Sequence, residues 1–491
     1  MGRDIDTVTI SPEHRARFRG RLLENQEALR RMIADGRFGF VRRRVGVELE
    51  ASLVGPDGDP IGVNAELLEL LAASGLDFQS ELGRFNIEFA SPPLPLGGGA
   101  LDALERSLAD TLDGARGCAD TLGARPVLIG ILPTITDFDV AEQNISVNPR
   151  YRMLNDAMLA ERGEQPHLHI EGADTLDLEI PSIAYAAACT SLQIHLEVRP
   201  EEFSAHWNAA TAASAALVAA SANAPLFLGR RLHHESRIAV FSQACDTRSR
   251  ELAAQGVAPR VWFGSGWVSD GALELFEQNL RWFPALLPLP EGDSPLDILD
   301  RGEIPPLAAL TLHNGTIYRW NRPVYGVMEG GPNLRIENRV MPAGPTIADV
   351  AANVALCLGL MRALALEERP LWERLPFGVA ASNFERAARD GIHARLAWPG
   401  VQGDLPACEL LLRLLPLARE GLAELGVATA EADRCLGIVE GRAHRRRNGA
   451  VWQLETWQAL RDGGRDPRDA ARELVRRYLE CAATGEPVHT W

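Results

Sequence analysis

Cysteine is scarce in this chain, and the cysteines that it has follow no pairing pattern. The 491 residues contain seven cysteines and no C-x-x-C pair. They stand far apart, at Cys118, Cys189, Cys245, Cys357, Cys408, Cys435 and Cys481. An odd number of widely spaced cysteines does not build a disulfide framework, so we predict reduced thiols and a cytoplasmic protein.

Positive charge is also in deficit. The 50 basic residues are outnumbered by 66 acidic ones, which gives a formal net charge of −16. This balance argues against nucleic acid or an anionic membrane as the main partner. It does not exclude a phosphate-bearing ligand, because arginines can gather locally.

A signal peptide and a membrane-spanning run are lacking as well. Residues 1–44 are rich in Arg and Glu and contain no apolar segment of the kind found in secretory signals. The most membrane-like stretch, Trp207–Gly229, is mostly Ala and Ser and includes Asn208, Asn223 and Pro225. That composition predicts a packed internal helix rather than a span. We therefore expect a soluble protein without a membrane partner.

Phosphate loops of the standard glycine-rich kinds do not occur. GSG at Gly264–Gly266 and GGPN at Gly330–Asn333 are predicted turns, because neither fits the strand-loop-helix context that such a loop needs. The basic run RAHRRRNG at Arg442–Gly449 is more typical of a solvated helix end than of a nucleic-acid patch.

The chain does contain strands and helices in alternation, followed by a long helical part. Ser11, Pro12 and Glu13 predict the start of a helix that reaches about Gly36. Strand-like runs include residues 45–50, 84–90, 126–133 and 190–198. The signal is almost wholly helical from Thr346 to about residue 480. This order favours an α+β fold with a mainly antiparallel sheet and flanking helices.

The strand VGVELE places two acids on one face. Successive side chains of a strand point to opposite faces, so Val45, Val47 and Leu49 share one face while Glu48 and Glu50 share the other. Two carboxylates roughly 7 Å apart repel each other unless water or a cation lies between them. A solvated outer face and a metal site both satisfy this pattern.

Three further segments repeat it. The polar residues concerned are Glu81 and Glu88 in SELGRFNIEF, Gln193, His195 and Glu197 in TSLQIHLEV, and Arg335, Glu337 and Arg339 in LRIENRV. For any one strand a solvated face is the simpler explanation. Four such strands favour a shared site, because Mg²⁺ is commonly held by a few carboxylates plus substrate phosphates. Arginines at the same face would neutralise a phosphoryl group in transfer.

These residues, in their order and spacing, resemble the glutamate–cysteine ligase family. The set comprises G-x-E-x-E (Gly46–Glu50), Glu81-x6-Glu88, T-S-x-Q-x-H (Thr190–His195), ANAPLFLG (Ala222–Gly229) with Ser236-Arg237 downstream, and R-x-E-x-R (Arg335–Arg339). The likeness covers roughly residues 40–400. It is closest to the bacterial carboxylate–amine ligase branch, whose catalytic fold is related to glutamine synthetase.

The resemblance implies a sheet-lined funnel that holds two or three Mg²⁺ or Mn²⁺ ions and ATP. The implied metal ligands are Glu48, Glu50, Glu81, Glu88, His195 and Glu337. The implied phosphate-contacting residues are Arg339, Arg237 and Arg335, with Thr190 and Gln193 in the nucleotide or amino-acid pocket. With the helical patterns before and after the region of resemblance, we predict three segments: an N-terminal helix at 1–40, a catalytic domain at 41–400 and a helical C-terminal extension packed on it at 401–491.

The implied reaction joins a carboxylate, such as that of glutamate, to an amine. ATP phosphorylates the carboxylate, and the amine attacks the acyl-phosphate to give an amide, ADP and phosphate. The family commonly has an acid after its E-x-R, whereas Arg339 here leads into Val340-Met341-Pro342, so the family name does not select the substrates. A homo-oligomer is compatible with the sequence.

Two other functions stay open. A ligase-fold protein without turnover could bind nucleotide or an amino acid and regulate a partner. A metal-dependent hydrolase could use His167, His169 and Glu171, which alternate in HLHIEG. The segment SNFERAARDGIHA, with Asn383, Arg386 and Arg389, would either close over the substrate or form a plain amphipathic helix.

One expectation about stability follows from the acids alone. Replacing Glu50 or Glu337 with Gln should abolish turnover and leave the fold at least as stable, because the loss of one like charge relieves repulsion when no metal is bound.

Overall fold

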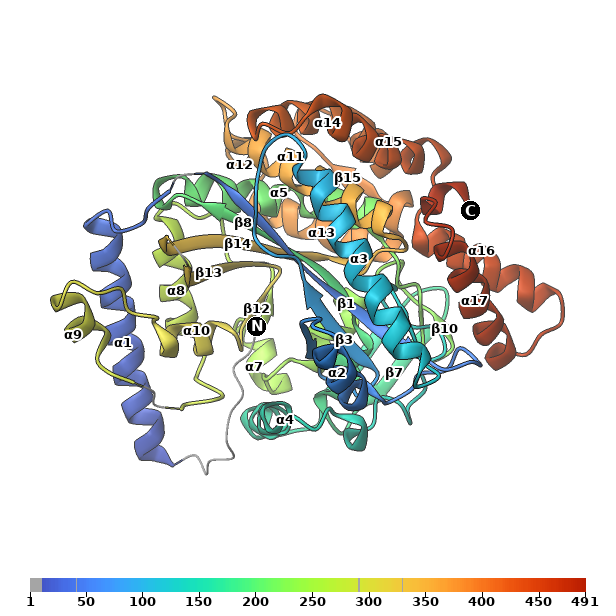
Figure 1. Cartoon of the computed structure of the whole chain (residues 1–491), viewed down its shortest axis with the longest axis horizontal. Coiled ribbons are helices and arrows are strands. Elements are labelled where there is room, and N and C mark those ends of the chain that lie inside the picture. Colours follow the sequence, from blue (N-terminus) through green and yellow to red (C-terminus); the bar gives the residue numbers. More distant parts are fainter. Residues whose placement is uncertain (1–10, 41, 290–291, 329) are drawn as a thin grey trace.

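A computed structural model describes residues 11–40, 42–289, 292–328 and 330–491 (Figure 1). Residues 1–10 of the predicted N-terminal segment lie outside the described residues. Helix α1 (Pro12–Ala34) begins as predicted, since the Ser11 side chain caps it by accepting a hydrogen bond from the His14 amide at 3.3 Å. The helix lies at the edge of the molecule in Figure 1, opposite the C-terminal helices.

An eight-stranded sheet forms the centre of the fold. Its main path runs in the order β13-β14-β8-β1-β3-β2, and β4 and β5 both pair with β1. The strands are β1 (Arg44–Val54), β2 (Phe78–Ser80), β3 (Asn86–Ala90), β4 (Leu94–Pro95), β5 (Arg125–Val127), β8 (Ser191–Val198), β13 (Asn321–Met328) and β14 (Gly331–Pro342). All the pairings between these strands are antiparallel. The predicted α+β class with a mainly antiparallel sheet is confirmed.

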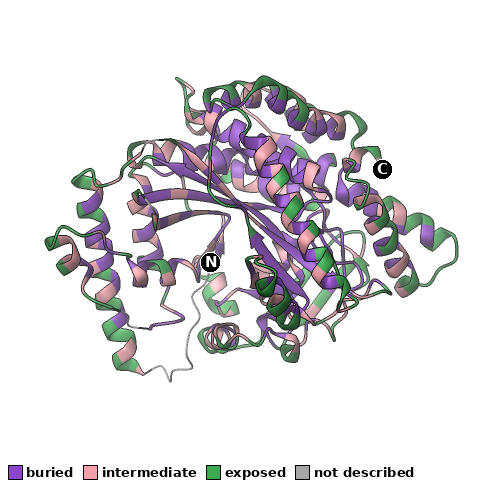
Figure 2. Ribbon diagram, in the orientation of Figure 1, coloured by how far each residue is buried: buried purple, intermediate pink, exposed green. Residues whose placement is uncertain are grey.

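Register places the apolar residues of neighbouring strands on one face. Val47 pairs with Ile194, and Leu49 pairs with Leu192. All four side chains are at most 1% exposed and belong to one continuous core. Helices α5 (Phe203–Ser221), which contacts β14, and α11 (Ile347–Ala365), which contacts β8, belong to this core. Figure 2 shows the sheet and both helices as largely buried.

Helix α11 is a core helix although its composition is that of a membrane span. It is the single described helix that is long and apolar enough to cross a membrane, and 83% of its most apolar window is buried inside the fold. Its Gly359 lies against Gly421 of α14 (Ala407–Glu424), where a Cβ on Gly421 would come within 1.9 Å of the Gly359 carbonyl oxygen. Glycine at this crossing therefore lets the two helices pack closely. The prediction that residues 207–229 contain an internal helix is also confirmed, by α5.

Four helices end the chain: α14, α15 (Thr429–Arg445), α16 (Gly449–Asp462) and α17 (Pro467–Ala482). They are drawn in red along one side of Figure 1. The interpretation of RAHRRRNG as a solvated helix end is wrong for Arg442, which is buried and pairs with the Asp349 carboxylate at 2.7 Å. The boundary at residue 400 stays a prediction.

The predicted strand at 126–133 is mostly wrong. Only Arg125–Val127 forms a strand, and the buried backbone that follows bonds elsewhere. The Gly130 amide donates to the Asn223 carbonyl at 3.2 Å, and its carbonyl accepts from the Thr190 amide at 3.0 Å. These bonds replace a strand ladder and connect this segment to the start of β8 and the end of α5.

Candidate active site

Register brings three of the predicted acids to one place. Glu50 of β1 pairs with Glu88 of β3, and Gln79 of β2 pairs with Glu88 on the other side. Glu81 follows β2 directly. Carboxylate oxygens of Glu50, Glu81 and Glu88 all lie within 4.8 Å of one another. We call these three residues the carboxylate trio.

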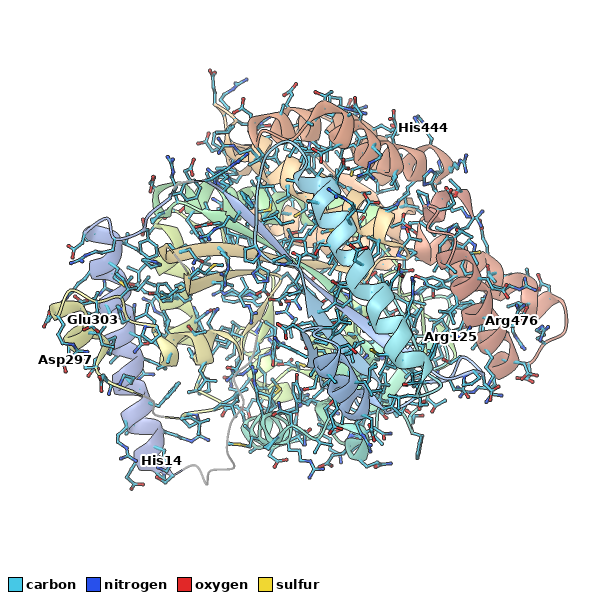
Figure 3. All side chains as sticks on the ribbon, viewed as in Figure 1. His14, Arg125, Asp297, Glu303, His444 and Arg476 are labelled. Carbon is cyan, nitrogen blue, oxygen red and sulfur yellow. The ribbon has the colours of Figure 1, made fainter. Side chains whose placement is uncertain are left out.

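The trio differs from the charged residues of the surface. Asp297 and Arg476, labelled in Figure 3, lie at the periphery and are exposed. Burial raises the pKa of Glu81 to about 8, and the Glu50 charge adds to this effect. Burial and the neighbouring carboxylates also raise the pKa of Glu88 well above its ordinary value. The trio is thus a set of close acids, two of them buried and Glu81 half-buried, whose ionised form requires a counter-charge.

Glu50 is held in place by hydrogen bonds from the adjacent strand. The Ser191 amide and hydroxyl donate to its carboxylate at 2.7 and 2.9 Å, and the Gln193 side-chain amide donates at 3.0 Å. Burial nevertheless raises the pKa of Glu50. Three oriented oxygen ligands within a few ångströms suit Mg²⁺ or Mn²⁺, because such cations prefer carboxylate ligands. The donor set therefore fits a divalent cation.

The other predicted metal ligands form a second cluster. His195 of β8 pairs in register with Glu337 of β14. Its Nε2 atom lies 3.2 Å from a Glu48 oxygen and 3.8 Å from a Glu337 oxygen. Both ring nitrogens of His195 are buried without a hydrogen-bond partner of good geometry among the described residues. The six predicted ligands thus converge as two groups of three.

Glu337 already has cationic partners. Its carboxylate binds Arg322 at 2.7 Å and Arg339 at 3.1 Å. Burial acts to raise its pKa, but these two charges outweigh that effect and lower the pKa to about 2. The premise that Glu337 is destabilised by like charges is therefore wrong, and the expected stability of a Glu337→Gln variant has to be reversed.

A cavity of about 540 Å³ opens beside the trio. Its acidic wall contains Glu48 and the trio. The predicted residues Gln193, Arg237 and Arg339 also line it, together with Arg150, Tyr151, Arg322, Tyr318 and Trp320. All its cationic side chains are arginines, since the chain contains no lysine. The cavity therefore presents carboxylates on the sheet and four guanidinium groups around them.

Aromatic side chains support two of these arginines. The Arg237 guanidinium lies 5.6 Å from the Trp320 ring centroid, and that of Arg339 lies 5.8 Å from the Tyr318 centroid. Phe241 packs against the edge of Tyr318 at 5.2 Å. These rings keep the guanidinium groups oriented and reduce the access of water to them.

Four predicted site residues lie outside the cavity lining: His195 and Glu337 of the second cluster, and Thr190 and Arg335. The Thr190 hydroxyl donates to the Ile129 carbonyl and, at 3.3 Å, to the Gly130 carbonyl, so it fixes backbone in the interior. Arg335, two residues before Glu337 on β14, donates to the Asn333 side chain at 3.1 Å. The expectation that Thr190 and Arg335 contact the ligand stays a prediction.

Two cationic residues were missed in the sequence. Arg322 is the register partner of Glu337 on β13, but a single arginine before a proline gives no strand pattern that marks it as functional. Arg150 stands in the first turn of α4 (Pro149–Arg162), within a loop-rich part of the chain. Neither position carried a signal that sequence reasoning alone could use.

The residues of the alternative metal motif lie on the surface, and His169 Nε2 is 3.3 Å from a Glu171 oxygen. His167 and His169 lie on the exposed hairpin of β6 (His167–Glu171) and β7 (Thr175–Glu179). Their rings bind the two oxygens of Asp177 at 2.6 and 3.2 Å, respectively. They are thus engaged in surface hydrogen bonds away from the cavity lining.

The possible lid segment is structural. Asn383 and Arg386 lie on α13 (Phe377–Asp390). The Asn383 amide donates to the Ala397 carbonyl at 2.7 Å, and Arg386 pairs with Asp404 at 2.8 Å. Both bonds attach α13 to a neighbouring hairpin. The amphipathic-helix interpretation is therefore the one that the contacts support.

Comparison with known proteins finds similarity to the same family. Residues 44–258 match the model of glutamate-cysteine ligase family 2 (GCS2). A Mycolicibacterium smegmatis protein with the provisional name glutamate–cysteine ligase 2-3 is 33% identical over 131 residues, which are 26% of this chain. The match spans 34% of that relative, about a third of its length.

The fold is shared with a solved structure. Glutamate–cysteine ligase from Francisella tularensis, in complex with AMP, superposes with a TM-score of 0.57 at 12% identity, over 90% of this chain and 89% of that chain. A bifunctional glutathione synthetase from Pasteurella multocida gives a TM-score of 0.48 at 12% identity, over 94% of this chain and 55% of that one. Through residues 44–258 the predicted resemblance to the glutamate–cysteine ligase family is confirmed.

Proposed function

We propose that this protein is an ATP- and Mg²⁺-dependent carboxylate–amine ligase. The observation that carries the proposal is the carboxylate trio, whose oxygens lie within 4.8 Å of one another at a cavity faced by four arginines. Acids gathered in this way serve to bind cations, and guanidinium groups opposite them serve to bind phosphate. The family match and the shared fold support the same class of reaction.

We assign metal binding to the acidic side of the cavity and phosphate binding to its arginines. The trio, and a second group of Glu48, His195 and Glu337, would hold Mg²⁺ or Mn²⁺, which supplies charge neutralisation on the phosphates of ATP. Arg237, Arg322 and Arg339 would stabilise the negative charge of the phosphoryl group as it moves to the carboxylate. Gln193 keeps the Glu50 carboxylate oriented.

No protein nucleophile is needed for acyl-phosphate formation. Two thiols, Cys189 and Cys245, line the cavity. Burial raises the pKa of Cys245 to about 12 and that of Cys189 well above its ordinary value. Both therefore stay protonated at neutral pH, and a covalent thioester route is disfavoured. The amine attacks the acyl-phosphate directly and gives the amide and phosphate.

The substrates belong to the proposal as well. We expect an amino acid such as glutamate as the carboxylate and a small amine as the acceptor, since four arginines favour anionic ligands. The AMP in the Francisella tularensis structure supports nucleotide binding by this protein. A cytoplasmic location and a possible homo-oligomer complete the proposal. The second function, regulation of a partner without turnover, would use the same cavity.

One assay separates these functions. The protein is incubated with ATP, Mg²⁺ and pools of amino acids and amines, and ADP and phosphate are followed. We expect release that requires both a carboxylate and an amine. Tight ATP binding with no release under any pool would favour the regulator, and product formation without ATP would contradict both.

A further inference from the structure

Arg237 pairs with a second buried residue, Glu235. Its Nε atom donates to the Glu235 carboxylate at 3.1 Å, and the two side chains are 3% and 0% exposed. Its terminal nitrogens donate to the carbonyls of Val340 and Arg339. The ring of Trp320 lies alongside the guanidinium. Every nitrogen of Arg237 is thus anchored, and Glu235 supplies the only charge among these partners.

Glu235 is in turn fixed by Asn223. It precedes α6 (Ser236–Ala244), but its side chain does not cap that helix. Its second oxygen instead accepts the Asn223 backbone amide at 2.9 Å. The carboxylate therefore bridges the residue that faces the cavity and the residue that follows α5.

Asn223 is hydrogen-bonded to two of the C-terminal helices. Its side-chain amide donates to the Tyr478 hydroxyl of α17 and to the Ala343 carbonyl, both at 2.9 Å. Gln453 of α16 donates to the Asn223 side-chain oxygen at 2.8 Å and to its backbone carbonyl at 3.0 Å. A Cβ on Gly449, the first residue of α16, would come within 2.1 Å of the Asn223 side-chain oxygen. Both helices therefore meet at this one side chain.

Tyr478 anchors the far end of this chain of bonds. Its hydroxyl donates to the Leu128 carbonyl at 2.7 Å while it accepts from Asn223. Its ring packs edge-on against Trp452 at 5.7 Å and Trp491 at 5.3 Å. Tyr478 is fully buried, so its hydroxyl cannot exchange these partners for water.

We propose that Glu235 is a positioning residue for Arg237, and that α16 and α17 set the position of that arginine through Tyr478, Gln453 and Asn223. The proposal rests on the proposed function for the use of Arg237, but its geometry stands without it. In buried networks each hydrogen bond polarises the next, so removing the Tyr478 hydroxyl weakens the hydrogen bonds that position the Arg237 guanidinium. The C-terminal helices would then be part of the catalytic apparatus.

The test uses two variants that each remove one polar group, with its two hydrogen bonds, and keep the volume nearly unchanged. Tyr478→Phe removes the hydroxyl, and Gln453→Met removes the amide. We expect each to lower kcat about tenfold, with the affinity for Mn²⁺ unchanged. The matched control is Tyr325→Phe, since the Tyr325 hydroxyl is buried, donates to the Pro305 carbonyl at 2.7 Å and lies outside the cavity lining.

A readout other than activity follows the arginine itself. In protein labelled with ¹⁵N-arginine, the Nε proton of Arg237, assigned by its loss in Arg237→Lys, should exchange slowly with water. We expect that exchange to quicken about tenfold in Tyr478→Phe and Gln453→Met but not in Tyr325→Phe. If wild-type protein shows no ligase turnover, the proposed function fails while this measurement still decides the inference.

A double-mutant comparison separates positioning from general structure. If Tyr478 acts through Arg237, the Tyr478→Phe change should cost nothing further in an Arg237→Lys background. An equal loss of kcat in both backgrounds, or unchanged Arg237 exchange in both C-terminal variants, would overturn the proposal. Glu235→Gln should show the largest loss of protection, because it leaves the guanidinium without a charged partner.

Discussion

Replacing Glu88 with Gln is expected to lower ATP-dependent turnover about a thousandfold. The variant lacks one of the three carboxylates proposed to bind the metal. A bound metal contributes several kcal/mol to phosphoryl transfer, and a loss of about 4 kcal/mol corresponds to a thousandfold lower rate. The same change should stabilise the metal-free protein, because Glu88 is repelled by Glu48, Glu81 and Glu50. Turnover and thermal unfolding in EDTA, with and without added Mn²⁺, measure both effects.

The stability that Glu88→Gln adds to the metal-free protein should increase with pH. A buried acid whose pKa is higher in the folded state than in the unfolded state destabilises the fold once the pH exceeds the unfolded-state pKa. The loss of stability grows until the pH reaches the folded-state pKa. For Glu81 that window runs from 4.5 to about 8, so the metal-free wild type should lose stability over it. The advantage of Glu88→Gln should be larger at pH 8 than at pH 5. Glu171→Gln, on the exposed hairpin, is the control, and equal Mn²⁺ responses in both variants would rule out a metal role for Glu88.

Replacing Glu337 with Gln should destabilise the fold by about 3 to 5 kcal/mol, as expected when one partner of a buried ion pair is removed. Its side chain is 1% exposed and pairs with Arg322 and Arg339, which are 14% and 13% exposed. The variant leaves two half-buried guanidinium groups without the Glu337 carboxylate. Urea unfolding in EDTA measures the loss in the absence of metal.

A control on the same sheet face separates burial from charge alone. Glu197→Gln removes a buried carboxylate from its pair with Arg44, whose side chain is more accessible at 29%. We expect less than half the loss, because water can solvate the remaining cation. Adding Arg322→Met to Glu337→Gln should recover part of the stability. Equal stability of the Glu337 and Glu197 variants would show that the ion pairs are not what holds Glu337.

The sequence predicts the faces of strands but not their partners. Period-two alternation correctly assigned Glu48 and Glu50 to one face, because side-chain direction along a strand is a local property. Register is set by contacts between distant segments. The pairing of Glu50 with Glu88, and of Glu337 with His195, therefore became visible only in the structure.

The differences from the expected positions have the same physical origin. Arg335 shares a face with Glu337 and Arg339, yet of these three residues Arg339 alone lines the cavity. Arg442 stands in a basic run that is typical of surfaces, but Asp349 from another helix makes its burial favourable. Thr190 fits a family motif, but it serves the backbone of a neighbouring segment. In each case the partner lies far away in the chain.

The central claim is that the acids of the sheet hold divalent cations. It is tested most directly by anomalous diffraction from crystals grown with Mn²⁺ and a non-hydrolysable ATP analogue. We predict a strong peak among the carboxylates of Glu50, Glu81 and Glu88, next to the phosphates of the analogue. Anomalous density confined to other acids, with none at these three residues, would contradict the claim.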